Sequence, residues 1–319
     1  RIIRALPPRT RDAFLLNRLS SPAGGIESPA AVAKYGKDLA KNPVGTGPFK
    51  FAEWIRDDHL TLVRNDDYWG DKSYLDKVVF KPMPEPEARA IALEAGDVQL
   101  AIRMNPEQLP RLQANKKIAV SLKPSTLNLF MGMHNQKKPF TDIRVRQALN
   151  HAVDKDAIVK NLYQGMADTL IGPVAEGATG YAKIDGFKYD PAKAKQLLAD
   201  AGYANGFSTT LVGTKGSYLK DYETSQAVQQ YLGAIGVNVK LEVQEWARYL
   251  DLLRTDPAKS PVEMWQDARG SNNAADSLLR VYGCDFFRPN GNNTHGFCNP
   301  AIDKLAVEAQ STLDVPKRD

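Results

Sequence analysis

Two cysteines are the residues of this 319-residue chain whose chemistry is easiest to define. Cys284 and Cys298 are the only cysteines, and the thirteen residues between them are rich in asparagine and glycine. A polar loop of this kind favours a disulfide over a metal site, because zinc would need further ligands and only His295 is near. We therefore expect a disulfide, which indicates an oxidising compartment.

The other reactive residue types form no recognisable catalytic or metal-binding pattern. The four histidines, His59, His134, His151 and His295, are far apart in the sequence and show no HExxH spacing. The serines show no GxSxG elbow, and the carboxylates form no recognisable acid/base pair. We expect no metal, no cofactor and no enzymatic activity. A hydrolase or transferase whose site is assembled from distant residues is the alternative.

Composition indicates a globular protein of about two ordinary domains. Hydrophobic residues make up 43% of the chain and charged residues 25%, with a net charge of +5. No run approaches 18 apolar residues, so no membrane span is expected. Basic residues are not interleaved with stacking aromatics, which argues against nucleic-acid binding.

Alternating strand and helix patterns predict an α/β fold. The clearest helix covers residues 191–201, with Asp190 as its cap, proline at its first position and Gly202 after its end. Asp142 and Asp154 are expected to cap two earlier helices. We also expect short strands at 98–101, 118–122 and 262–265, followed by a polar loop.

A glycine and proline turn that leads into a strand, NPVGTGPFKFAEW at 42–54, carries a family resemblance. With no Lys-Ser/Thr and no helix start after it, this turn is not a phosphate cradle. Together with NDDYWG at 65–70, it resembles the extracytoplasmic solute-binding proteins, family 5, of peptide and nickel ABC importers. The stretch at 135–159, NQKKPFTDIRVRQALNHAVDKDAIV, is similar to the opening of that family's second lobe.

The resemblance implies a two-lobed periplasmic binding protein of type II architecture, from the peptide-binding cluster. Residues 1–41 would end an early subdomain, 42–125 would form part of lobe I, and 126–319 would form lobe II, with the crossover near 123–126. It also implies that N-terminal and C-terminal parts of the protein lie outside this chain.

The function implied by the resemblance is capture of a small solute between two lobes and its delivery to an ABC permease in the membrane. The solute could be a peptide, a modified peptide, a sugar derivative or a metal chelate. We expect a periplasmic or extracytoplasmic monomer that binds no nucleic acid, with a membrane anchor in a missing N-terminus left open. A sensory or chaperone use of the same fold is a further alternative.

Two family elements direct attention to ligand contacts, and both depart from the family pattern. In peptide-binding relatives a tryptophan is followed by an aspartate that holds the ligand's α-amino group; here Trp265 is present, but Asp267 follows it too closely. Asn272-Asn273-Ala274 replaces the family's Asp-Pro turn. A Gly-Arg-Tyr element reads Gly216-Ser217-Tyr218, so a bidentate carboxylate partner is lost.

Six residues are therefore expected to contact the solute: Trp265, Tyr218, Asp267, Arg269, Asn135 and Lys215. Aromatic faces supply contact area and a polar edge in a closing cleft. Packing in the core is the competing interpretation, above all for Trp265 and Tyr218. Trp246, at helical spacing with Tyr249 and Leu250, is expected to pack in the interior rather than to bind.

Overall fold

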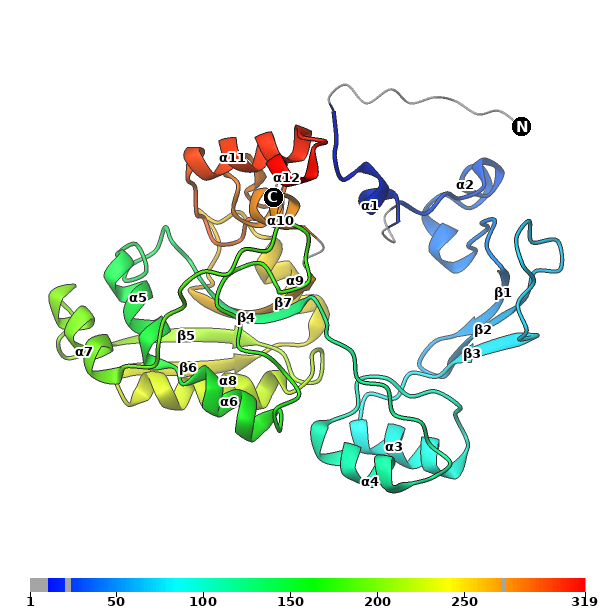
Figure 1. Cartoon of the computed structure of the whole chain (residues 1–319), viewed down its shortest axis with the longest axis horizontal. Coiled ribbons are helices and arrows are strands. Elements are labelled where there is room, and N and C mark those ends of the chain that lie inside the picture. Colours follow the sequence, from blue (N-terminus) through cyan, green and yellow to red (C-terminus); the bar gives the residue numbers. More distant parts are fainter. Residues whose placement is uncertain (1–10, 21–23, 271–272, 319) are drawn as a thin grey trace. The chain divides into compact units, whose positions relative to one another are not determined.

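The computed structural model describes residues 11–20, 24–270 and 273–318. The chain divides into two compact units, Phe14–Ala88 and Arg89–Asp319 with Arg1–Ala13. Strands and helices alternate through the larger unit, as predicted for an α/β fold (Figure 1). Within the described ranges, no helix is both long enough and apolar enough to cross a membrane. The domain boundaries expected at 41 and 125 stay a prediction.

The smaller unit is built on a three-stranded antiparallel sheet with the order β1-β2-β3. Its elements are α1 (Leu15–Leu19), α2 (Pro29–Tyr35), the 3-10 helix η2 (Gly36–Lys41), β1 (Phe49–Ile55), β2 (His59–Arg64) and β3 (Lys77–Phe80).

The turn before β1 is held by the motif that follows β2. Asn65 donates its side-chain Nδ2 to the carbonyl of Gly47 at 2.9 Å and its backbone N–H to the carbonyl of Pro48 at 2.9 Å. Phe49 then pairs with Arg64. The two N-terminal stretches that carry the family resemblance thus form one end of one sheet.

The larger unit is built on a four-stranded sheet with the order β4-β7-β5-β6 (Figure 1). Its elements are α3 (Pro86–Ala95), which begins in the smaller unit, η3 (Pro106–Gln108), α4 (Leu109–Ala114), β4 (Leu127–Met133), α5 (Ile143–Ala152), α6 (Lys155–Leu162), α7 (Pro191–Asp200), β5 (Phe207–Gly213), α8 (Asp221–Gly233), β6 (Val237–Val243), α9 (Trp246–Arg254), β7 (Met264–Gly270), α10 (Ala274–Tyr282), η4 (Cys284–Phe286), α11 (Pro300–Ser311) and α12 (Val315–Arg318).

The directions of the strands decide on which side of this sheet their carboxyl ends lie. β5 runs parallel to both β6 and β7, whereas β4 pairs antiparallel with β7. The carboxyl ends of β5, β6 and β7 therefore lie on the same side of the sheet, where a loop follows each strand. We call this side the carboxyl edge. Ligands of open α/β sheets bind outside such an edge.

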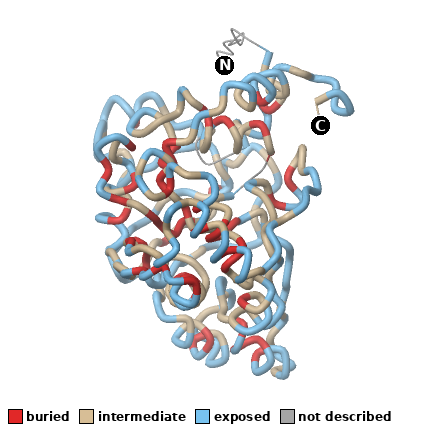
Figure 2. The backbone as a smooth tube through the Cα atoms, turned by 90° about the vertical axis from the view of Figure 1, so that its left-hand side faces the viewer, coloured by how far each residue is buried: buried red, intermediate tan, exposed pale blue. Residues whose placement is uncertain are grey.

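Two apolar clusters cover the two faces of the sheet. Met264 belongs to a large cluster with residues of α5 to α8, whereas the next residue, Trp265, packs with Tyr249, Leu253 and Val262. Successive strand residues point to opposite faces, so the two clusters lie on opposite sides. Along the whole chain, buried segments are interspersed with exposed ones (Figure 2).

The predicted helix caps are confirmed. The carboxylates of Asp142, Asp154 and Asp190 accept hydrogen bonds from backbone N–H groups in the first turns of α5, α6 and α7, at 2.8 to 2.9 Å. Gly202 follows α7 with a φ of +89°, which only glycine adopts without strain.

Three strand predictions were wrong in part or in full. Residues 98–101 and 118–122 are not strands, and apolar Leu100 is largely exposed there, because no neighbouring described strand pairs with it. The third strand starts two residues later than predicted and continues to Gly270 through the expected polar loop. It does so because β4 pairs with β7 along its whole length.

Gly132 on β4 offers a test of the packing behind β7. A Cβ at Gly132 would lie 2.3 Å from Cε2 of Trp265, whereas one at Gly270 would meet nothing within 4 Å. We expect Gly132→Ala to lower the free energy of unfolding by about 1–3 kcal/mol. Gly270→Ala, the matched control on the paired strand, should change it by less than about 0.5 kcal/mol. Urea unfolding measures both, and equal effects would contradict close packing at Trp265.

Candidate functional site

Three of the six predicted residues meet at the carboxyl edge of the sheet. Asp267 and Arg269 lie two residues apart on β7, so their side chains share one face. Tyr218 comes from the loop that follows β5, the parallel neighbour of β7. The carboxyl edge therefore carries a carboxylate, a guanidinium group and a phenol.

Hydrogen bonds join these three side chains. The Tyr218 hydroxyl donates to Oδ1 of Asp267 at 3.1 Å, and Nε of Arg269 donates to Oδ2 at 2.9 Å. The Arg269 side chain is 21% exposed and that of Asp267 10%. Burial, followed by the Asp267 charge, raises the pKa of Tyr218 well above its ordinary value. The phenol therefore stays protonated and can donate.

A buried carboxylate shapes the loop that presents Tyr218. Asp221, almost fully buried, accepts hydrogen bonds from the backbone N–H groups of Gly216, Ser217 and Tyr218 at 2.8 to 3.1 Å. It also accepts from the Thr214 hydroxyl at 2.9 Å. The loop that departs from the family's Gly-Arg-Tyr pattern is thus ordered by a carboxylate at the start of α8.

Trp246 was expected to pack in the interior, and the structure places it partly at the surface, beside Tyr218. It stacks on Tyr249 as expected, with ring centroids 5.7 Å apart, yet it is 41% exposed. Its ring also meets Tyr218 edge to face at 5.9 Å. Trp246 lies in the first turn of α9, directly after the carboxyl end of β6. That position in the sequence could have indicated that it lies near the site.

Trp265 is fully buried, with no exposed surface. Its indole packs against Gly132, Tyr249 and His295, and the nearest ring centroid is that of His295 at 4.8 Å. This geometry does not support direct contact with a solute. Trp265 shares the face of β7 with Asp267 and Arg269 and packs in the apolar cluster on that side of the sheet.

Asn135 and Lys215 are not brought into the hydrogen-bonded group. Asn135 follows β4, whose last residue pairs with the first of β7, so it lies at the opposite edge of the sheet. Its amide donates to the carbonyls of Met133 and His295 at 3.1 and 3.2 Å. Lys215 is exposed, and its Nζ lies 5.4 Å from the centre of the Tyr222 ring.

The predicted disulfide is confirmed, and it closes a loop that reaches the site. Cys284 and Cys298 are bonded. Within the loop, the carbonyl of Asn292 accepts from Nη1 of Arg269 at 3.3 Å, and His295 packs on Trp265. The disulfide-closed loop, residues 284–298, therefore forms a wall beside β7.

The replacement of the family's Asp-Pro turn falls partly outside the described residues. Asn272 lies there, whereas the Asn273 side chain accepts from the backbone N–H of Asp276 at 2.7 Å and caps α10. Nowhere in the described ranges do three or more histidine, cysteine or acidic side chains gather so that they could hold a metal ion.

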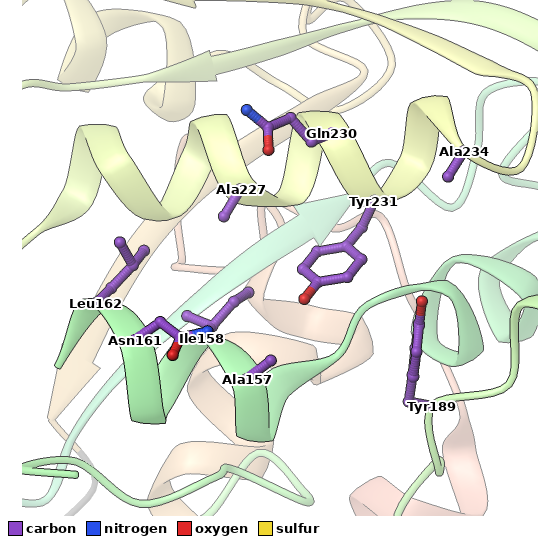
Figure 3. Close-up of a pocket in the computed structure, with 9 residues that line it drawn as sticks. All are labelled: Ala157, Ile158, Asn161, Leu162, Tyr189, Ala227, Gln230, Tyr231 and Ala234. Atoms are coloured by element: carbon purple, nitrogen blue, oxygen red, sulfur yellow. The ribbon is translucent and has the colours of Figure 1, made fainter. Parts of the chain in front are cut away.

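A pocket of about 450 Å³ lies between α6 and α8, away from these residues (Figure 3). Tyr189 and Tyr231 meet edge to face there, with ring centroids 5.7 Å apart. None of the six predicted residues lines it. Its lining residues are Ala157, Ile158, Asn161, Leu162, Tyr189, Ala227, Gln230, Tyr231 and Ala234.

Comparison with known proteins agrees with this architecture. Residues 8–291 match the family described as bacterial extracellular solute-binding proteins, family 5 Middle. The chain belongs to this family of solute-binding proteins. The family resemblance read from the sequence is confirmed.

Curated relatives of this solute-binding protein include glutathione-binding proteins. The chain is 32% identical over 310 residues to GsiB of Pectobacterium atrosepticum, covering 96% of the chain and 60% of that relative. For GsiB of Escherichia coli K12 the identity is 31% over 303 residues, covering 94% and 59%. The chain thus spans about three fifths of the length of these relatives.

Solved structures of similar proteins share its fold. The periplasmic binding protein DppA of Helicobacter pylori, in complex with the peptide STSA, gives a TM-score of 0.85 at 31% identity. The match covers 97% of this chain and 61% of that one. MoaA of A. tumefaciens R10, in complex with mannopinic acid, gives 0.83 at 28% identity, covering 97% and 63%.

Asp221 gives a test of how the Tyr218 loop is held. We expect Asp221→Asn to lower the free energy of unfolding by about 2–4 kcal/mol, because an amide cannot accept all the hydrogen bonds that the buried carboxylate accepts. Asp251→Asn, the same change at an exposed position of α9, should change it by less than about 0.5 kcal/mol. Chemical unfolding compares them, and a neutral Asp221 variant would exclude this role.

His295 gives a test by pH. Burial, then the charges of Arg269 and His134, lowers the pKa of His295 from 6.5 to about 3. Between these values the unfolded chain binds the extra proton, so stability falls as pH falls, by about 1.4 kcal/mol per pH unit from this group. Buried His134, whose pKa burial also lowers, acts in the same direction.

We therefore expect His295→Gln to reduce the loss of stability between pH 6.5 and 4, measured by urea unfolding at each pH. His59→Gln is the control, since hydrogen bonds with Glu53 and Asp58 raise, rather than lower, the pKa of half-buried His59. An unchanged slope in His295→Gln would mean that this imidazole is not held neutral.

Proposed function

We propose that this chain is part of the substrate-binding component of an ABC importer. It captures a peptide-like or other small solute between two lobes, in the periplasm or another extracytoplasmic space, and delivers it unaltered to the membrane permease. Family membership over residues 8–291 is the observation that carries this proposal.

The chemistry of the carboxyl edge suits a peptide-like solute. Arg269 supplies a partly exposed cation, the Asp267 carboxylate fixes its position, and the Tyr218 and Trp246 rings supply aromatic area. Such a combination of aromatic surface and a few placed polar groups is typical of small-molecule sites. Relatives named for glutathione, and a similar structure with the peptide STSA, are consistent with a short peptide or peptide derivative.

Closure requires solute contacts that favour one arrangement of the lobes over another. Glu107 and Lys220 lie on the two sides of the crossover predicted at 123–126, and their side chains form an ion pair of 2.6 Å. Lys220 is 11% exposed at its side chain. Burial acts to raise the pKa of Glu107, but hydrogen bonds from Lys220 and its own backbone outweigh it, so the pKa is lowered. The pair lies within the larger compact unit and joins residues from both sides of that predicted crossover.

Native mass spectrometry of the full-length chain, purified without denaturation, tests the function. We expect an unaltered small solute to copurify, and reduced glutathione or Ala-Ala-Ala to bind in calorimetry. Trp246→Ala should weaken that binding about tenfold by removing aromatic contact area, whereas Trp69→Ala, at an exposed tryptophan of the smaller unit, should not. Turnover of these probes, or absence of any bound solute, would contradict a transport role.

A further inference from the structure

Two arginines lie near the carboxyl edge, and only one of them is paired with a carboxylate in the described part of the chain. Arg269 pairs with Asp267, whereas Arg288, in the disulfide-closed loop, has no carboxylate of the described residues within ion-pair distance. Among the described residues, its one side-chain hydrogen bond runs from Nε to the Thr294 hydroxyl at 3.5 Å. The group therefore carries a surplus of positive charge.

Asp267 cannot neutralise both arginines. Its Oδ1 already accepts from the Tyr218 hydroxyl at 3.1 Å and from the backbone N–H of Ala268 at 2.9 Å. Its Oδ2 accepts from Nε of Arg269. With both oxygens engaged, the carboxylate has little capacity left for Arg288.

Arg288 is partly buried and held by a constrained loop. Its backbone N–H donates to the carbonyl of Asn293 at 3.4 Å, and the Thr294 hydroxyl donates to the carbonyl of Leu253 at 3.2 Å. The disulfide closes the base of this loop. Nη1 of Arg269 donates to the carbonyl of Asn292, the neighbour of Asn293, so both arginines bond to the same two-residue stretch of this loop. Burial, then the charges of Arg269 and Arg254, lowers the pKa of Arg288.

A partly buried cation without an acid is costly, and an incoming anion removes that cost. Nη2 of Arg269 and both Nη atoms of Arg288 make no hydrogen bond to the described residues, so they can donate to a ligand. Guanidinium groups bind carboxylates through two parallel hydrogen bonds, which lysine cannot reproduce.

We propose that Arg288, together with Arg269, binds a carboxylate of the solute, so that the transported solutes are anionic peptides or peptide-like acids. This inference rests on the proposed function. It moves carboxylate recognition away from the loop position held by Ser217 to β7 and the disulfide-closed loop.

Calorimetry with the full-length chain and matched probes tests the proposal. The acids are reduced glutathione and Ala-Ala-Ala, and their neutralised partners are the diethyl ester of glutathione, with both carboxyl groups esterified, and Ala-Ala-Ala amide. We expect each acid to bind about 10- to 100-fold more tightly than its partner, the range for a hydrogen bond to a charged group.

Variants assign the effect to Arg288. Arg288→Gln should weaken binding of the acid by a similar factor and leave the ester or amide nearly unchanged, and Arg288→Lys should recover only part of the loss. Arg248→Gln, at an exposed arginine of α9, is the matched control and should leave all affinities unchanged. Circular dichroism and urea unfolding check that each variant folds.

The outcomes separate this inference from the proposed function. Equal affinity for acid and neutral partner, or equal weakening of both by Arg288→Gln, would overturn the inference while the transport function stands. An uncharged copurified solute would do the same. If no probe binds and native mass spectrometry finds no solute, the proposed function fails and the inference fails with it.

Discussion

Backbone pairing of β7 is the constraint on which the candidate site depends. Every residue from Met264 to Gly270 has a partner on β4, although the second half of β7 is polar. Buried backbone groups must be hydrogen-bonded, and this pairing satisfies them while alternation sends Trp265, Asp267 and Arg269 to one face. Along that face the side chains become more exposed, from the buried indole of Trp265 to the partly exposed guanidinium of Arg269.

Elements with strong local signals were predictable from the sequence, and elements made by distant pairing were not. The helix α7 has a cap, an initial proline and a terminal glycine within thirteen residues, so local chemistry defines it. Polar QDARG has no such signal, because β4, more than a hundred residues earlier, makes it a strand. Leu100 shows the reverse case, since an apolar run without a partner does not form a strand.

The candidate site was predictable where a family pattern pointed to it and hidden where three-dimensional neighbours create it. Tyr218, Asp267 and Arg269 were named from the resemblance and meet in the structure. Trp265 was named for the same reason but is fully buried in the core beside them. Arg288 went unnoticed, because a single arginine in a polar loop gains meaning only beside Arg269 and an already engaged Asp267.

The contact between Gly132 and the Trp265 ring has an evolutionary consequence. An indole that occupies the space of a missing side chain makes the two positions interdependent, so homologous sequences should change them together or keep both. A branched residue at 132 should coincide with a smaller residue at 265. Such correlated variation would identify relatives that share this packing, whichever solute they bind.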